Sequence, residues 1–268
     1  MGMNHSTARR LKDEEIKQDL KFALFSDSRP VDNEFYWNTV RSKLLLQHNV
    51  DFVINLGDFT KWSWPWEYRN YFSKIPSGSV MFHMIGNHDN RIFGNWLFKR
   101  YFGSWDFTLE YGRWVFVFAR NAYVIKYGIC PEQKKWLEQE LERAHNKFQK
   151  VCIFTHVPPL SPFSTLDLPQ EKLLEDSRYE KILGSSHAPE LAFYGHAHLY
   201  AQRKENRTVH VISGGAALEE DLHDCPIDPP HTYRGQHATL VTVRQKGSFT
   251  IELMLPDGTI EPRYTRKG

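Results

Sequence analysis

The sequence predicts an α/β protein, and two features of the chain lead to this class. Short runs rich in Val, Ile, Leu and Phe alternate with longer segments in which apolar residues recur every three to four positions, as strands alternate with helices. In addition, five of the apolar runs lead directly into short segments that contain Asp, Asn or His. Loops that follow the strands of an open α/β sheet meet at one edge, so we expect these segments to lie together.

The composition fits one large domain with a sizeable core. The chain has 268 residues, 41% of them hydrophobic, and a net charge of +2. So small a net charge gives no reason to expect dedicated nucleic-acid binding. No run approaches ~18 consecutive apolar residues, so no membrane span is expected. The three cysteines are widely spaced and odd in number, which favours a reducing compartment.

The beginning of the chain is polar. We expect residues 1–20 to form a polar N-terminal tail or helix, with any helix over Lys12–Leu20, and residues 21–268 to form one domain. The first twenty residues lack the apolar stretch of a signal peptide, so a cytoplasmic location is expected; a leader removed beforehand would leave the same sequence.

The first half of the domain is expected to open with a βαβ unit. A strand ends at Phe25, a helix with one apolar stripe runs from about Asn33 to Gln47, and a second strand covers Asp51–Leu56. A third strand follows and is flanked by two aromatic segments. The strand is Val80–Ile85, and the aromatic segments are Lys61–Ile75 before it and Ile92–Trp105 after it.

Proline and glycine mark the elements of the second half. Strands over Thr108–Glu110 and Arg113–Ala119 are expected to form a hairpin. Pro131 opens a helix to about Asn146, because proline at the first helical position costs no hydrogen bond. Pro169 and Gly184 bracket a further helical region. The remaining strands are expected to end at Phe154, Tyr194, Ser213, Val243 and Leu255.

The five polar segments contain residue types that hold divalent metal ions. Asp and Asn supply oxygen, and His supplies imidazole nitrogen. In the last segment two histidines stand two positions apart, so in extended backbone both face the same way and one loop can serve two ions. The segments are Ser26-Asp27-Ser28-Arg29, Gly57-Asp58, Gly86-Asn87-His88-Asp89, Thr155-His156-Val157 and Gly195-His196-Ala197-His198.

The order and spelling of these segments resemble the calcineurin-like metallophosphoesterases, whose pattern reads DxH, GD, GNH(D/E), H and GHxH. The resemblance extends from Phe22 to about Leu218. The stretch Gln133–Leu141, and Gly195–Tyr200 followed by Val209–Gly215, look most like the purple-acid-phosphatase branch. The resemblance implies a four-layer α-β-β-α sandwich with two mixed sheets and a dinuclear metal site at the strand ends, so residues 21–268 would be a metallophosphoesterase domain.

The resemblance also implies which residues hold the metals. The matching ligands are Asp27, Asp58, Asn87, His156, His196 and His198. Asp58 would bridge both ions, Asn87, His156 and His196 would complete the second ion's set, and Asp27 and His198 would complete the first. The two divalent ions are expected to be manganese, with iron or zinc as the alternatives.

The catalytic roles follow from the same resemblance. The expected reaction is hydrolysis of a phosphate monoester or diester by a hydroxide that bridges the metals. His88 would stabilise charge on the phosphoryl group or protonate the leaving oxygen, and Asp89 would fix the tautomer of that imidazole. The substrate would be a phosphorylated small molecule, with a nucleotide or a lipid head group as the specialised alternatives.

Arg29 departs from the family pattern, because it stands where the family has a histidine ligand. A guanidinium has no lone pair to give to a metal, so the first ion would keep Asp27, Asp58 and His198. Such an oxygen-rich set favours manganese over zinc. Arg29 either assists the site by binding phosphate with its planar fork or turns outward into a surface salt bridge.

Two further alternatives stay open. Trp62, Trp64 and Trp66 either pack a cap onto the sheet or stack against a substrate. The protein is either a metal-dependent phosphoesterase or a non-catalytic metal- or partner-binding scaffold on the same fold, and Arg29 is the feature that keeps the scaffold hypothesis open.

Overall fold

The computed structural model describes residues 2–13, 15–29, 48–75, 78–123, 126–216 and 231–267. The helix expected from Asn33 to Gln47 lies outside the described residues, as does Cys225.

The described strands form two mixed sheets, one of six strands and one of seven. The six-stranded sheet has the order β13-β12-β11-β1-β2-β3, with β1 Asp19–Phe25, β2 Phe52–Asn55, β3 Met81–His83, β11 Ala238–Arg244, β12 Phe249–Met254 and β13 Ile260–Arg266. The seven-stranded sheet has the order β10-β8-β9-β7-β6-β5-β4, with β4 Phe107–Tyr111, β5 Trp114–Phe118, β6 Lys150–Phe154, β7 Leu191–Tyr194, β8 Tyr200–Glu205, β9 Thr208–Ser213 and β10 Thr232–Tyr233. The hairpin expected around Tyr111-Gly112 is confirmed as β4–β5.

The sheets pack face to face around an aromatic core. Phe22 and Phe52 of one sheet stack at 5.1 Å between ring centroids, and the ring of Phe116 from the other sheet meets Phe22 edge-on at 5.6 Å. Offset and edge-to-face contacts of this kind add roughly 0.5–1.5 kcal/mol per pair to the burial of the rings. The runs of Phe and Val that predict strands are therefore also the residues that join the two sheets.

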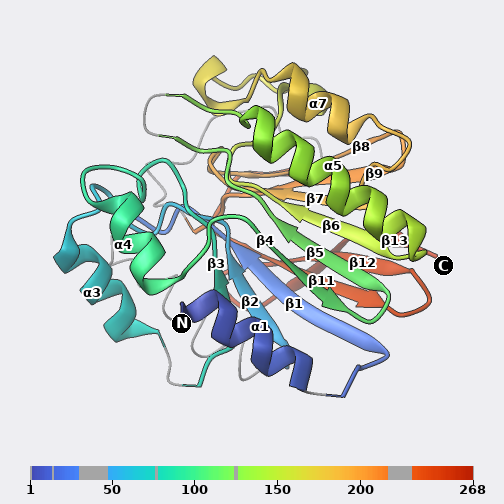
Figure 1. Ribbon diagram of the computed structural model, residues 1–268, viewed down its shortest axis with the longest axis horizontal. Helices are drawn as coiled ribbons and strands as arrows, with labels where there is room; N and C mark the ends of the chain where they lie inside the picture. The colour runs from blue at the N-terminus through green and yellow to red at the C-terminus, as the bar shows by residue number, and fades with distance from the viewer. Residues whose placement is uncertain are drawn as a thin grey trace.

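Helices cover the outer face of each sheet, which completes the predicted α-β-β-α sandwich (Figure 1). The helices α3 Pro65–Lys74 and α4 Gly94–Tyr101 pack on the six-stranded sheet, and α5 Pro131–Asn146 and α7 Ser177–Leu183 pack on the seven-stranded sheet. Two short turns, α6 Leu160–Phe163 and η2 Gln170–Lys172, precede α7. None of the described helices combines the length and apolar character needed to cross a bilayer.

The helix α5 begins and ends where the sequence predicts. Pro131 is its first residue, and the Cys130 sulfur accepts a hydrogen bond from the Gln133 backbone at 3.4 Å, which caps the open end. The buried face consists of Gln133, Leu137, Leu141 and Ala144. This face lies against the outer side of β5 and β6.

The N-terminal helix is not where the sequence pattern placed it. The helix α1 covers Met3–Asp13, whereas β1 already begins at Asp19, within the expected Lys12–Leu20 helix. Leu11 belongs to the core between the sheets, and Asn4 bonds to the His83 backbone in both directions, at 2.8 and 2.9 Å. A polar segment thus covers the edge where β3 and β4 would otherwise be open.

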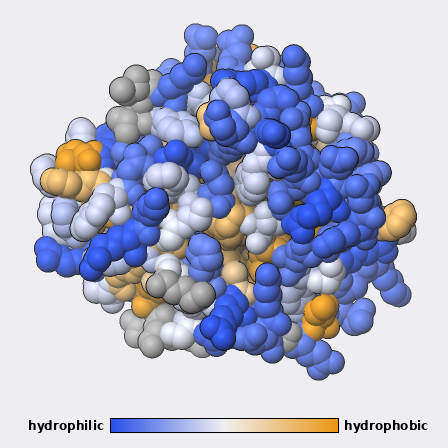
Figure 2. All heavy atoms as spheres, viewed as in Figure 1, coloured by the Kyte–Doolittle hydropathy of each residue, from blue (hydrophilic) through white to orange (hydrophobic). Residues whose placement is uncertain are grey.

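The first aromatic segment is divided between core and surface. Tyr68 and Tyr71 on α3 are buried against the sheet, as the packing alternative expected. Trp62, Trp64 and Trp66 are instead 47%, 39% and 56% exposed, so packing is the wrong interpretation for the tryptophans. Figure 2 shows hydrophobic side chains at the surface near α3 and α4, at the left edge of the view.

Candidate metal centre

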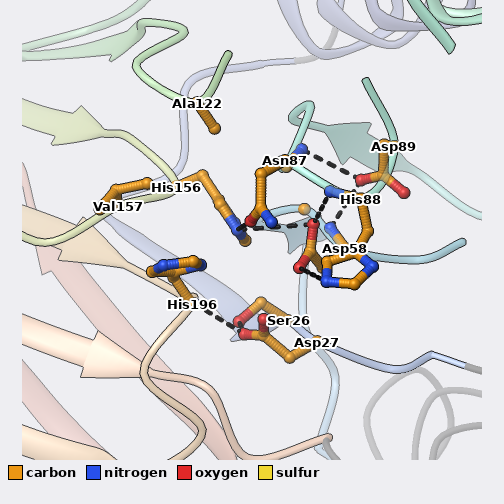
Figure 3. A network of polar contacts seen from close by, with 12 residues as sticks. Ser26, Asp27, Asp58, Asn87, His88, Asp89, Ala122, His156, Val157 and His196 are labelled. Atoms are coloured by element: carbon orange, nitrogen blue, oxygen red, sulfur yellow. Dashed lines mark hydrogen bonds and ion pairs between the residues drawn. The ribbon is translucent and has the colours of Figure 1, made fainter. Parts of the chain in front are cut away.

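All five polar segments follow strands that run parallel to a neighbour in their own sheet. β1, β2 and β3 are parallel in the six-stranded sheet, and β6 and β7 are parallel in the seven-stranded sheet. Parallel strands end at the same edge, so their loops meet across the gap between the sheets. Figure 3 shows the side chains of Asp58, Asn87, His156 and His196 pointing toward one another at this place.

Four of the predicted ligands stand on left-handed backbone. The φ angles are 67° at Asp27, 58° at Asp58, 68° at His196 and 52° at His198. Residues with a side chain adopt this conformation at an energetic cost, and such residues cluster at functional sites. The sharp turn after each strand aims the side chain into the site rather than along the strand.

A buried cluster of three side chains has the geometry of a metal site. Asp58, His156 and His196 each place one donor atom within 4.8 Å of the others. The amide oxygen of Asn87 adds a fourth donor, 3.2 Å from Nε2 of His156. That nitrogen lies 3.5 Å from Oδ1 of Asp58. The donor set of oxygen and imidazole nitrogen suits a divalent transition metal.

Backbone carbonyls fix which nitrogen of each imidazole faces the cluster. Nδ1 of His156 donates to the Leu56 carbonyl at 2.9 Å, and Nε2 of His196 donates to the Glu171 carbonyl at 3.0 Å. The remaining nitrogens, Nε2 of His156 and Nδ1 of His196, are those available as ligands. Such outer hydrogen bonds orient histidine ligands in metal sites.

Asp27 adds a buried oxygen with an open acceptor. Its Oδ2 accepts hydrogen bonds from the His196 backbone at 2.8 Å and from the hydroxyl of Ser26. Its Oδ1 accepts no hydrogen bond from the residues that the structure describes, and it lies 3.4 Å from Nε2 of His198. A buried carboxylate oxygen without a donor is costly unless a cation completes it. Oδ1 of Asp27 therefore favours a nearby positive charge, which either a metal ion or a guanidinium can supply.

Charge in the cluster is balanced by an extra proton when no ion is present. Burial alone would raise the pKa of Asp58 and lower that of His156. Their mutual attraction outweighs burial, so the pKa of Asp58 lies well below its usual range and that of His156 rises to about 9. Burial and the neighbouring His156 lower the pKa of His196 to about 3, which keeps that ring neutral. A bound ion would replace the proton on His156.

The expected pairing of Asp89 with the His88 imidazole is wrong. The carboxylate of Asp89 accepts hydrogen bonds from the backbone of Asp58 at 2.6 Å, Thr60 at 2.8 Å and Gly86 at 3.0 Å. It is fully buried, and its role is to hold the two loops together. Nδ1 of His88 instead donates to the Lys61 carbonyl at 2.9 Å.

Arg29 faces the site, so the outward salt bridge is also wrong. Its Nη1 donates to Nε2 of His88 at 2.7 Å, and its Nη2 donates to Nε2 of His198 at 2.8 Å. Its Nε lies 3.8 Å from Oδ2 of Asp58. Nε2 of His88 accepts from Arg29 while Nδ1 donates, so this imidazole is neutral. Its pKa is lowered mainly by burial and further by the charge of Arg29, which agrees with the neutral form.

Three residues at the site had no recognisable signal in the sequence. Lys172 donates to the His196 carbonyl at 3.1 Å, and Nη2 of Arg91 lies 3.4 Å from Nε2 of His88. Asn121 holds the loop after β6, because its side-chain oxygen accepts from the backbone of His156 at 3.0 Å and from that of Val157 at 2.9 Å. All three come from segments outside the five motifs.

A cavity of about 440 Å³ is connected to the cluster through one of its lining residues, Tyr127. Its wall includes Tyr123, Tyr127 and Ile129, with the cations of Lys126 and Arg178 also lining it. The ring of Tyr127 meets the imidazole of His196 edge-on at 5.1 Å. One aromatic side chain therefore forms part of the cavity wall and contacts a predicted ligand.

Solved structures with similar folds include phosphatases. The purple acid phosphatase PPD1 of yellow lupin (Lupinus luteus) seeds has a TM-score of 0.67 at 16% identity, over 92% of this chain and 53% of that chain. A dimetal phosphatase from Danio rerio has a TM-score of 0.69 at 14% identity, over 91% and 99%. This chain thus spans about half of the lupin structure and nearly all of the zebrafish one.

A similar fold also occurs in a protein that is described as an anchor and not as a phosphatase. GAP50, described as the anchor in the inner membrane complex of Plasmodium, has a TM-score of 0.65 at 11% identity, over 94% of this chain and 90% of that chain.

No curated protein sequence matches this chain. The family model for calcineurin-like phosphoesterases matches residues 20–200, which is more than half of the chain and includes all five motifs. The chain belongs to the calcineurin-like phosphoesterase family.

Proposed function

We propose that this protein hydrolyses phosphate esters with the aid of a divalent metal ion. The observation that carries the proposal is the buried cluster of Asp58, His156 and His196, completed by the amide oxygen of Asn87. When bound there, a divalent ion supplies Lewis acidity toward a phosphate oxygen and toward water. Manganese is the proposed ion, because oxygen and imidazole donors both accept it.

The cations around the cluster would bind the phosphate group. Arg29 presents guanidinium N–H groups from one side of the cluster, and Lys172 and Arg91 lie beside His196 and His88. Guanidinium groups suit phosphate oxygens because their donors form a planar fork. Donors aimed at the phosphoryl oxygens stabilise the charge that these oxygens carry in the transition state.

His88 is proposed to accept a proton rather than to supply one. It is neutral, because Nδ1 donates to the Lys61 carbonyl and Nε2 accepts an N–H of Arg29. When that N–H turns to a phosphate oxygen, the Nε2 lone pair becomes available to a water molecule. As water attacks phosphorus, the new O–P bond forms, the bond to the leaving oxygen breaks, and a proton of the water passes to Nε2. Neutral imidazole is the state that can receive it.

The cavity beside Tyr127 would hold the organic part of the substrate. Its aromatic wall matches a leaving group with a planar ring, as a nucleoside has, and Lys126 adds a positive charge. The exposed Trp62 offers a second surface for stacking, and its ring centroid lies 4.8 Å from Cζ of Arg91.

The test of the activity is phosphate release by the purified chain loaded with Mn²⁺. Aryl, nucleoside and glycerol phosphates should be tried as monoesters, together with an aryl diester. We expect turnover that a chelator abolishes and that His156→Ala lacks. Tyr127→Ala should raise KM for aryl and nucleoside esters but not for glycerol phosphate. Trp62→Ala should raise KM for the same esters only if the substrate ring stacks on Trp62 as well.

A scaffold that binds a partner is the second candidate. Arg29 favours it, because a guanidinium bonded to His198 reduces the metal ligands that this chain can offer. GAP50 has a similar fold and is described as an anchor. If the chain binds Mn²⁺ by metal analysis and still releases no phosphate from any of the esters, the scaffold function replaces the enzymatic one.

A further inference from the structure

The guanidinium of Arg29 contacts two of the three side chains that a first metal ion would need. That ion would be held by Asp27, Asp58 and His198. Nη2 of Arg29 donates to Nε2 of His198 at 2.8 Å, and Nε lies 3.8 Å from Oδ2 of Asp58. Oδ1 of Asp27 is 3.4 Å from the same nitrogen of His198. A cation thus already lies beside His198 and Asp58, and His198 in turn faces Asp27.

Nε2 of His198 cannot accept the hydrogen bond of this guanidinium and bind a metal ion at once. A metal ion stands about 2.0–2.1 Å from a ligating imidazole nitrogen, along its single lone pair. In this structure the lone pair of Nε2 accepts the hydrogen bond from Nη2 of Arg29. The space that the ion would fill on this side is therefore taken by an N–H group.

Other contacts hold the guanidinium in this place. Nη1 of Arg29 donates to Nε2 of His88 at 2.7 Å, so the fork is attached to histidines from two different loops. The side chain of Arg29 is only 15% exposed. A long side chain that is largely buried and bonded at both ends of its fork has little freedom to leave.

Among the residues that the structure describes, no arginine or lysine side chain donates to the ligand nitrogens of the second metal position. Nε2 of His156 and Nδ1 of His196 face the cluster, since their other nitrogens donate to backbone carbonyls. From this contrast we infer that the guanidinium of Arg29 replaces the first metal ion, and that this chain binds a single divalent ion at Asp58, Asn87, His156 and His196. The inference rests on the proposed function only in that the ion concerned is the one proposed to assist hydrolysis.

The charge of the site remains suited to phosphate with one ion. One divalent ion and one guanidinium bring three positive charges against the carboxylates of Asp27 and Asp58, so one net positive charge is left. The guanidinium also offers N–H donors to phosphate oxygens, which a naked ion does not. Arg29 would therefore bind the phosphate from the position where a relative with histidine has its first ion.

Metal content tests the inference independently of activity. The chain is stripped with a chelator, loaded with Mn²⁺, and analysed by elemental analysis and by electron paramagnetic resonance. We expect one Mn²⁺ per chain and the spectrum of an isolated ion. Arg29→His should raise the content to two per chain and give the spectrum of an exchange-coupled pair, because it removes the guanidinium and adds an imidazole.

Two histidines of the same loop provide a matched pair in the wild-type background. His198→Ala should keep the single ion with an affinity within a few-fold of wild type, because His198 is a partner of Arg29. His196→Ala should lose it, because His196 is a ligand. This pair keeps the test decisive even if Arg29→His fails to fold.

Two bound ions in the wild type, or loss of an ion in His198→Ala, would overturn the inference and leave the proposed hydrolysis intact. One bound ion in a wild-type protein that releases no phosphate would support the role of Arg29 and reject the proposed hydrolysis.

Discussion

Glycine residues allow the loops of the metal centre to pack closely against one another. A Cβ atom on Gly86 would lie 2.1 Å from Oδ1 of Asp58, and one on Gly195 would lie 2.4 Å from the hydroxyl of Ser26. Real Cβ atoms do not approach other atoms so closely, so the ligand loops could not pack as they do. The glycines of the GD, GNH and GHxH motifs are explained by this close approach.

Substituting Gly86 should therefore weaken metal binding. Gly86→Ala is expected to displace Asp58 and to raise the dissociation constant for Mn²⁺ by at least ~10-fold, which corresponds to roughly 1.4 kcal/mol. Calorimetric titration measures the effect. Gly184→Ala is the control, because its Cβ would meet no atom closer than 3.4 Å, and it should bind Mn²⁺ as wild type does. Equal affinity in both variants would contradict the role of Gly86.

His88 and Asn87 are adjacent in sequence but should differ in effect. The imidazole of His88 bonds to Arg29 and to the Lys61 carbonyl, whereas the amide of Asn87 faces the ligand His156. His88→Ala should keep the Mn²⁺ content and lower kcat by roughly 10²–10⁴-fold, as loss of an acid–base group does. Asn87→Ala should weaken metal binding. If His88→Ala loses the ion as Asn87→Ala does, His88 is a ligand instead.

At the scale of elements, α1 shows how a polar helix can be part of the core. Two of its three buried residues are polar: Asn4 pairs with the His83 backbone, and Thr7 donates to the Met81 carbonyl at 3.1 Å. These bonds satisfy the outer edge of β3, which would otherwise present unpaired backbone groups. The helix therefore protects the strand that leads to Asn87 and His88.

Removing the Asn4 side chain should destabilise the whole fold. Asn4→Ala leaves an N–H and a carbonyl of His83 buried without their partner, at a cost of about 1–3 kcal/mol for each unsatisfied group. Urea denaturation should show a lower free energy of unfolding by about 2 kcal/mol or more. Ser6→Ala, an exposed change on the same helix, is expected to stay within about 0.5 kcal/mol of wild type. Similar midpoints for both variants would show that α1 is not needed for stability.

At the scale of the whole molecule, the two sheets contribute different halves of the site. The six-stranded sheet supplies Asp27, Asp58 and Asn87, and the seven-stranded sheet supplies His156 and His196. The aromatic core between the sheets fixes the distance between these halves. Metal binding therefore depends on the packing of the sandwich and not only on the loops.

The stability of the sandwich should fall in mild acid. His83 is fully buried, and burial lowers its pKa from 6.5 to about 3. Because the folded pKa lies below the unfolded value, the stabilisation is present above pH 6.5 and is lost as the pH falls toward 3. Between pH 7 and pH 5 the loss is about 2 kcal/mol for this residue.

Comparing variants isolates this contribution from those of other titrating groups. His83→Gln should reduce the difference in unfolding free energy between pH 7 and pH 5 by about 2 kcal/mol. His145→Gln, which changes an exposed histidine, should leave the difference as in wild type. Parallel pH profiles for all three proteins would contradict a neutral buried His83.

The sequence alone determined the class of fold, the five strand-end motifs and the family. These features are local, because apolar periodicity marks the strands, proline marks the start of α5, and each motif is a few consecutive residues. The residues Asp58, Asn87, His156 and His196 could therefore be named before their positions were known. The inward face of α1 is mostly polar, and β10 has only two residues, so no apolar pattern marks either element and both depend on tertiary contacts.

Only the tertiary structure decided what the individual side chains contact. Arg29 could have turned either way until His88 and His198 were seen to accept its N–H groups. Asp89 follows His88 in sequence, but its carboxylate meets backbone groups of other loops because the turn separates adjacent side chains. Lys172 reaches the site from a segment without a motif. Contacts between residues far apart in the chain depend on the distance between the sheets, and no local pattern records that distance.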